Sequence, residues 1–134
     1  MSAKLGRDLL LKVHDGQTYI TVAGLRTKSV RFNSQSVDVT DSGSNGWTEL
    51  LPKAGIRTLG ITGSGVFRDS ASDIRIRSAF FAQDPLDARM ILPGLGTIEA
   101  PVLVTALTYG GTYRGEATFE LTLSASGEVS FVPE

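Results

Sequence analysis

The sequence predicts a mainly β protein, a β-sandwich or partial barrel with one packed α-helix and a long hairpin arm. Segments of alternating apolar and polar residues recur along the chain, turn-forming residues separate them, and one stretch has helical periodicity. The length of 134 residues is typical of one domain. We therefore expect residues 1–134 to form a single domain, from which an arm of about residues 40–54 extends.

The chain begins with a predicted hairpin. Residues 8–13 and 18–22 alternate as strands do, and they flank His14-Asp15-Gly16-Gln17. An Asp-Gly pair between two such segments is a strong signal for a tight turn.

Two longer strands follow, at residues 26–38 and 56–67. In the first, Val30 and Phe32 share one phase of the alternation, whereas Val37 and Val39 have the other. A strand cannot change phase without a bend or a bulge, so one is expected within residues 33–36.

Between these strands lies a polar segment, residues 40–54, that is long for a connection within a small domain. It is rich in turn formers but also contains Trp47, Leu50 and Leu51, which a disordered linker would rarely include. The segment therefore favours a hairpin arm that buries these three side chains against another subunit. The alternative is that Trp47 covers the core of its own subunit.

Residues 70–82 are predicted to form the helix. Ser70 or Asp69 can cap the first turn, and Asp73 lies near its positive end, four residues before Arg77, where a weak surface ion pair is expected. Asp84-Pro85 ends the helix. The face predicted to pack consists of Ile76, Ala79, Phe80 and Gln83.

A second hairpin, residues 101–109 and 113–125 around Gly110-Gly111-Thr112, and a last strand at residues 128–132 complete the pattern. In the second strand of this hairpin, Ala117, Phe119, Leu121 and Leu123 alternate with a polar set and are expected to face the core. The polar face either lines a channel built from several subunits or is simply exposed to solvent. That face consists of Glu116, Thr118, Glu120, Thr122 and Ser124.

Composition excludes several classes of protein. The chain has no cysteine and a net charge of −1, which argues against disulfides and against a general phosphate-binding surface. No apolar run reaches the roughly 20 residues of a membrane span, and the N-terminal residues lack the apolar core of a signal peptide. We expect the protein to be made and assembled in the bacterial cytoplasm.

Catalytic patterns are weak. His14 is the only histidine and lies at a predicted surface turn. The aspartates at 38, 41, 69 and 73 do not follow a calcium-loop pattern. Gly63-Ser64-Gly65 lacks the Lys-Ser or Lys-Thr of a phosphate loop, and its glycines indicate close backbone packing in a strand. We expect no catalytic, cofactor-binding or metal site, and no enzyme.

Several motifs carry a family resemblance over nearly the whole chain. They are VAGLRT at 22–27, VDVTDS at 37–42, GWTELL at 46–51, GSGVFRDS at 63–70 and YGGTYRGEATFELTLSASGEVSF at 109–131. In this order and spacing they resemble the short major tail proteins, or tail tube proteins, of long-tailed phages and of phage-like gene transfer agents.

The resemblance implies a structural subunit that forms hexameric rings, stacked into a tube through which double-stranded DNA leaves the particle. Its partners would be further copies of itself and the tape measure, terminator and distal tail proteins, in the tail of a virion or phage-like particle. In such a tube we expect Glu116, Thr118, Glu120 and Thr122 to face the lumen, because a wall without fixed cations does not retain phosphates.

Two other classes remain open. The first is another β-rich tail or secretion-tube component, such as a tail terminator. The second is a carbohydrate-binding β-sandwich, and an enzyme ranks last.

Overall fold

A computed structural model describes residues 9–133 of the chain. These residues form one α-helix and eight strands, all in one antiparallel sheet with the order β2-β1-β5-β6-β7-β4-β3, and β8 pairs with β6 outside this path. The mainly β class is thus confirmed. The strands are β1 (Leu10–His14), β2 (Tyr19–Thr21), β3 (Leu25–Ser34), β4 (Arg57–Val66), β5 (Leu86–Leu92), β6 (Gly96–Gly110), β7 (Thr118–Ala125) and β8 (Ser130–Pro133).

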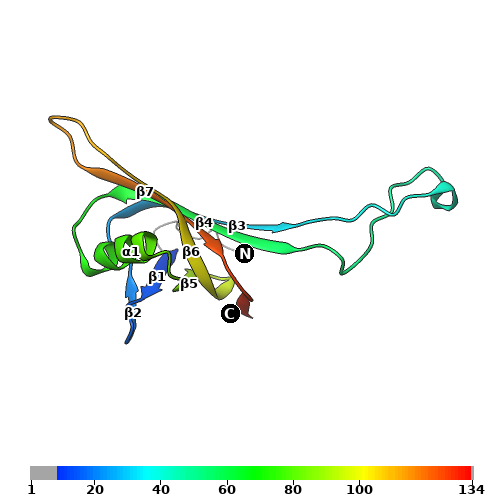
Figure 1. The fold of residues 1–134 in the computed structure, drawn as a ribbon, viewed down its shortest axis with the longest axis horizontal. Coiled ribbons are helices and arrows are strands. Elements are labelled where there is room, and N and C mark those ends of the chain that lie inside the picture. Colours follow the sequence, from blue (N-terminus) through cyan, green and yellow to red (C-terminus); the bar gives the residue numbers. More distant parts are fainter. Residues whose placement is uncertain (1–8, 134) are drawn as a thin grey trace.

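Strand β6 joins two halves of the sheet. Its first part pairs with β5 and β8, and its later part pairs with β7, with a register shift between Val104 and Ala106. The 15 residues of β6 pair with strands of both halves. The two layers of the expected sandwich therefore belong to one continuous sheet. Figure 1 shows β1, β2 and β5 beneath the part that contains β3, β4 and β7.

The core lies between these halves and α1 (Ala71–Ala82). Alternation predicts which side chains of β7 point inward, and Phe119, Leu121 and Leu123 are indeed buried, whereas Ala117 precedes the strand and is exposed. The helix contributes Ile76 and Ala79. The strands supply the rest of the buried apolar set, which includes Leu11, Val13, Leu59, Ile61, Leu86, Met90, Ile98 and Val102.

The helix matches its predicted span, but its ends and its orientation differ from expectation. Ser70 is the N-cap residue, yet its side chain makes no capping bond and its Oγ lies 2.9 Å from Oγ of Ser72. Gln83 ends the helix with a left-handed φ of 55° and is exposed, so it is not on the packed face. Asp73 is only 5% exposed, so the expected surface pair with Arg77 is wrong: the helix turns this residue toward the protein interior.

Several strand boundaries differ from those that the sequence predicts. Strand β5 and the first residues of β6 were not predicted, and β7 begins at Thr118 rather than at residue 113. The β3–β4 ladder shifts register between Leu25 and Thr27 and runs regularly from there to Ser34. The bend or bulge expected within residues 33–36 therefore does not interrupt the ladder. The register changes just beyond it, between the hydrogen bond of Gln35 with Ile56 and the bridge of Asp38 with Leu50. Asp8, the first residue of a predicted strand, lies outside the described residues.

The arm continues from β3 and β4 well beyond the core, as Figure 1 shows. The amide of Gln35 donates to the carbonyl of Ile56 at 2.9 Å, and an antiparallel bridge joins Asp38 and Leu50. The tip contains a short 3-10 helix, η2 (Ser42–Ser44), whose first turn is capped by the side chain of Asp41. The predicted hairpin arm is therefore present, although most of it is not regular strand.

Candidate functional site

A four-stranded part of the sheet, built from the second half of β6 with β7, β4 and β3, has two open edges. Within the described residues, β3 pairs only with β4. The β5–β6 ladder ends where Leu86 pairs with Val102. Beyond Val102, β7 is the strand that pairs with β6 among the described residues. Open edges present unpaired backbone donors and acceptors, which favour pairing with another chain.

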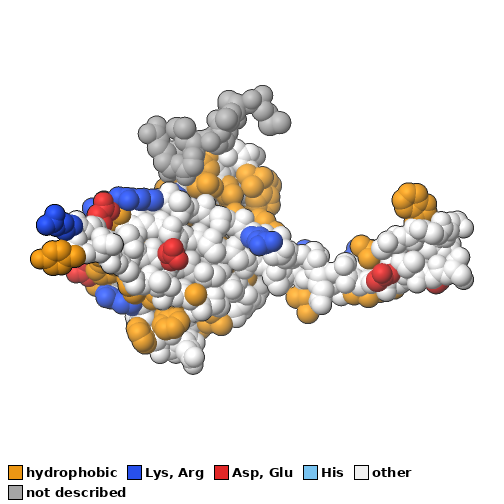
Figure 2. Space-filling model, turned by 90° about the horizontal axis from the view of Figure 1, so that it is seen from above, with side chains coloured by type: hydrophobic (Ala, Val, Ile, Leu, Met, Phe, Trp, Pro, Cys, Tyr) orange, Lys and Arg blue, Asp and Glu red, His pale blue; other side chains and the backbone are white. Residues whose placement is uncertain are grey.

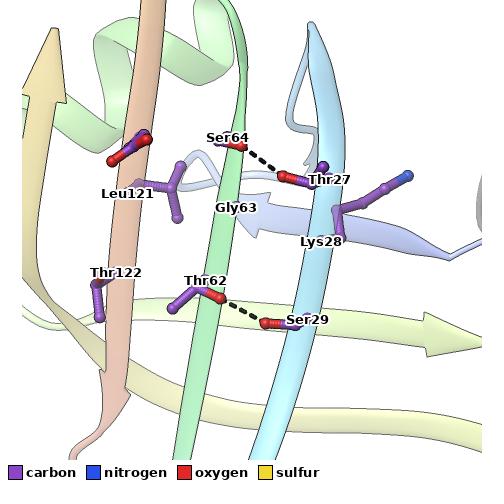
Figure 3. Close-up of a pocket in the computed structure, with 9 residues that line it drawn as sticks. Thr27, Lys28, Ser29, Thr62, Gly63, Ser64, Leu121 and Thr122 are labelled. Atoms are coloured by element: carbon purple, nitrogen blue, oxygen red, sulfur yellow. Dashed lines mark hydrogen bonds between the residues drawn. The ribbon is translucent and has the colours of Figure 1, made fainter.

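The face of this part that points away from the core is lined by hydroxyl groups. Ser29, Thr62 and Thr122 form one row across β3, β4 and β7, and Thr27, Ser64 and Glu120 form the next. Figure 3 shows the hydroxyl groups of Thr27 and Ser64 hydrogen-bonded to each other, and those of Ser29 and Thr62 likewise. These pairs leave a shallow polar hollow with few ionic groups.

The four lumen candidates do not all lie on one strand. Thr118, Glu120 and Thr122 are on β7 at alternate positions and therefore share a face, whereas Glu116 lies in the loop before the strand. There Glu116 accepts from the guanidinium of Arg26 at 2.8 Å. This exposed ion pair, formed by residues 90 positions apart, was not anticipated from the sequence.

Cations contribute little to the hydroxyl face. Lys28 lies at the opposite phase of β3 from Thr27 and Ser29, and its ammonium group donates to the carbonyl of Leu9. Arg26 is paired with Glu116, so Arg31 is the cation of β3 that shares the face without a described ion pair. Because the carboxylate of Glu120 is on the same face as Arg31, their formal charges balance and the face is close to neutral.

The arm tip has a defined shape but exposes its large apolar side chains. Trp47 is 79% exposed, Leu50 51% and Leu51 48%. Trp47 therefore does not cover the core of its own subunit. Local hydrogen bonds fix the tip: Thr40 Oγ1 accepts from the amide of Glu49 at 2.7 Å, and Ser44 Oγ donates to the Glu49 carboxylate at 3.2 Å. The tip thus combines a hydrogen-bonded backbone with large apolar side chains that are exposed.

The titratable residues considered from the sequence as possible catalytic or metal-binding groups include one at a turn and one on the arm. His14 lies at the β1–β2 turn, where its Nδ1 accepts from the amide of Gly16 at 3.0 Å. Hydrogen bonds from the side chain and amide of Thr40 hold the pKa of Asp38 below its ordinary value. The described residues contain no group of three or more potential metal-ligating side chains, and no helix among them is both long and apolar enough to cross a membrane.

Two features of the interior bear on stability rather than on binding. A Cβ atom at Gly65 would lie 2.0 Å from the carbonyl oxygen of Gly24, which confirms the close backbone packing expected at Gly63-Ser64-Gly65. Burial raises the pKa of Asp73, although Arg77 and the amide of Asp69 oppose this effect. One oxygen of this carboxyl group, Oδ2, has no hydrogen-bond partner.

Open sheet edges, a hydroxyl face and an exposed apolar arm together define a β-rich structural subunit. Comparison with known families gives the same class in more detail. The family model for the phage tail tube protein matches residues 3–131, and the chain belongs to that family.

Solved structures agree with this assignment. The chain is 38% identical to a protein in the tail of an empty gene transfer agent (GTA) particle refined with C6 symmetry, with a TM-score of 0.93 over 97% of this chain and 99% of that one. A chain in the virion of a native GTA particle is 39% identical, with a TM-score of 0.91 and the same coverage. The SPP1 tail tube shares the fold alone, at 11% identity and a TM-score of 0.77 over 97% of this chain and 79% of that one. No protein with a curated description matches.

Proposed function

We propose that six copies of this structural subunit close into a ring through their open sheet edges, and that the rings stack into a tube that conducts double-stranded DNA. The observation that carries the proposal is the four-stranded segment with one open edge on β3 and another on β6. The sixfold number is taken from the C6 symmetry of the similar GTA tail.

Strand directions are compatible with such a ring. Successive strands β3, β4, β7 and β6 are antiparallel, so β6 of one copy would meet β3 of the next copy in the antiparallel sense as well. A closed barrel leaves no edge, whereas any open chain of copies leaves two. Contacts of this kind join two different surfaces of neighbouring copies. They close into a ring when a whole number of the rotations between neighbours makes one full turn.

The resulting channel is wide enough for a double helix. Six copies with four strands each give about 24 strands, and with a spacing of about 4.8 Å and a tilt of about 40° the circumference is about 150 Å. The backbone diameter is then about 48 Å. Side chains narrow this opening, but a double helix still fits.

The hydroxyl face is proposed to line the lumen, with Thr118, Glu120 and Thr122 on the wall and Glu116 at its rim. Phosphate groups bind where fixed cations gather, and each contact adds a salt-dependent attraction. This face carries hydroxyl groups, the carboxylate of Glu120 and one guanidinium, that of Arg31, whereas the guanidinium of Arg26 is paired with Glu116. Such a wall allows DNA to slide.

Replacing Glu116 and Glu120 by lysine tests the lumen assignment. Assembled tubes of this variant are expected to retain DNA at low salt and to release it as salt rises. The control is Glu128→Lys, which changes one exposed carboxylate outside β7 and matches the charge change of Glu120→Lys alone, so that single variant is measured beside the double one. If the double variant retains no more DNA than the control, the assignment of this face to the lumen is wrong. The proposal that the subunits form a tube would still stand.

The arm is proposed to connect subunits. We assign residues 1–134 to a single tail tube domain whose arm, about residues 40–54, buries Trp47, Leu50 and Leu51 against a neighbouring copy. The exposure of these side chains on an ordered tip supports the assignment. Tape measure, terminator and distal tail proteins are the proposed further partners, assembly is proposed to occur in the bacterial cytoplasm, and we assign no catalytic activity or cofactor.

Ring formation is tested with the purified protein at high concentration. Light scattering and negative-stain microscopy are expected to show sixfold rings or stacked tubes. A species that stays monomeric at every concentration would contradict the proposal.

A further inference from the structure

Two charged side chains of the hydroxyl face form no ion pair within the described residues. Arg31 is on β3, in the row that continues through Gly60 and Ser124, and Glu120 is on β7. Both are exposed, and the ion pairs found among the described residues involve other side chains. Figure 2 views the molecule from above, the side on which β3, β4 and β7 lie in Figure 1, and the middle of the body shows few charged side chains there.

Within one copy these two charges are too far apart to meet. Ser124 is the residue of β7 in the row of Arg31, and Glu120 lies four residues away from it along the strand. A strand spacing of about 4.8 Å and a rise of about 3.3 Å per residue give a Cα separation of about 16 Å between Arg31 and Glu120. Side chains that both rise from the same sheet do not span this distance.

Closing the sheet into a barrel brings other residues together. The strands of a barrel are tilted, so equivalent rows of neighbouring copies are staggered along the strands. Four strands per copy at a tilt of about 35–45° give a stagger of about four to six residues per copy. Because side chains alternate, only an even stagger keeps the hydroxyl groups on one side of the wall. The stagger is therefore about four or about six residues.

The direction of the stagger follows from the handedness of the chain. Gln35 has the same phase as Arg31, and its amide donates to the carbonyl of Ile56 on the β4 side. For L-residues this places β4 to the right of β3 when the hydroxyl face is viewed with the arm upward. Barrel strands follow the common twist of sheets. With the hydroxyl face inside, Arg31 therefore lies beside residues of the next β6 that are nearer than Leu103 to the β6–β7 turn.

This stagger brings Glu120 of the next copy close to Arg31. In the ladder of β6 with β7, Leu103 pairs with Ser124, and Thr108 pairs with Glu120 four positions further along β7. A stagger of four residues puts Arg31 in the row of Thr108 and Glu120, with a Cα separation from Glu120 of about 10 Å. A stagger of six residues gives about 12 Å. Arginine and glutamate side chains together bridge either distance, and the short side chain of Thr108 leaves room between them.

We propose that Arg31 of one copy forms an ion pair with Glu120 of the next copy across the lateral joint. This inference rests on the proposed ring with the hydroxyl face inside. It adds a register for the pairing of β6 with β3 and a charge contact that favours this register. The pair also neutralises the guanidinium that the wall would otherwise present to DNA.

Mixing two charge-reversed variants tests whether the pair joins different copies. Arg31→Glu alone or Glu120→Arg alone places like charges at every joint, and each is expected to raise the protein concentration needed for assembly at least about fivefold. In an equimolar mixture, an alternating ring has opposite charges at every joint. The mixture is therefore expected to assemble within about twofold of the concentration that the natural chain needs. A pair within one copy would not be restored by mixing.

The control replaces Glu120→Arg by Glu128→Arg, which reverses an exposed carboxylate outside β7. Its mixture with Arg31→Glu has the same total charge but is expected to show no rescue. The defect of each single variant should also shrink as salt rises, because salt screens exposed charges. Circular dichroism checks that every variant folds, and light scattering with negative-stain microscopy reports assembly.

The outcomes separate this inference from the ring itself. If the natural chain makes rings and the mixture of Arg31→Glu with Glu120→Arg assembles no better than its components, the ion pair is wrong and the ring stands. Equal rescue by the Glu128→Arg mixture would also overturn the pair, since total charge would then explain the result. If the natural chain makes no rings, the proposed ring and this inference fail together.

Discussion

Deleting residues 42–52 removes the outer part of the arm and should separate folding from assembly. The deleted segment carries Trp47, Leu50 and Leu51, and its only buried side chain is Ser44. It contributes no apolar side chain to the core. Shortening a loop also slightly favours closure of its ends. The free energy of unfolding of the isolated subunit should therefore change by less than about 1 kcal/mol.

The effect on assembly should be much larger. A buried aromatic side chain removes about 200 Å² from water, so the exposed part of Trp47 is worth up to about 4 kcal/mol at each contact. The half-exposed leucines add about 1 kcal/mol each. A total of about 6 kcal/mol corresponds to roughly four powers of ten in the association constant.

Circular dichroism and thermal unfolding report the fold of the deletion variant, and light scattering with negative-stain microscopy reports its assembly. The expected result is a folded subunit that makes no tubes at concentrations where the natural chain does. Trp47→Ala alone should give an intermediate defect. If the deletion variant still polymerises at the same concentration, the arm is not the connector.

Two further predictions concern the subunit itself. Because burial raises the pKa of Asp73, the charged form costs stability once the pH exceeds the folded-state pKa, so Asp73→Asn should stabilise the protein at neutral pH by about 1 kcal/mol. That gain should vanish as the pH falls toward 3.8, the ordinary pKa of an aspartate. Thermal unfolding at several pH values measures the gain, and a gain that is independent of pH would contradict the reasoning. Gly65→Ala should destabilise the fold by roughly 3 kcal/mol. The control Gly60→Ala, whose Cβ would meet nothing nearer than 4.0 Å, should cost far less stability. Equal losses of stability in denaturant unfolding would refute the close-packing argument.

Features with local signals were predicted well from the sequence. The arm follows from turn formers around isolated apolar residues, and the helix span follows from its periodicity and from Asp84-Pro85. The inward-facing side chains of β7 follow from simple alternation. Strand β5 also alternates, since Leu86, Ala88 and Met90 are buried between Asp87 and Arg89. That signal was present and was missed.

Other features depend on contacts between distant residues. The helix is oriented partly by Ser72, whose hydroxyl accepts from the amide of Ala23 at 3.1 Å, 49 residues away. This contact accompanies the burial of Asp73 and could not be read from helical spacing. The ion pair of Glu116 with Arg26 likewise joins a loop to a strand across the sheet. The open edges themselves follow from strand order, which alternation alone does not determine.

A reconstruction of assembled tubes by electron cryo-microscopy would test the central claim most directly. The account predicts one continuous antiparallel sheet around each ring, in which β6 of each copy pairs with β3 of the next. Glu120 and Thr122 should face the axis, and α1 should lie outside the barrel. A tube in which these strands do not pair between copies, or in which the hydroxyl face points outward, would contradict it.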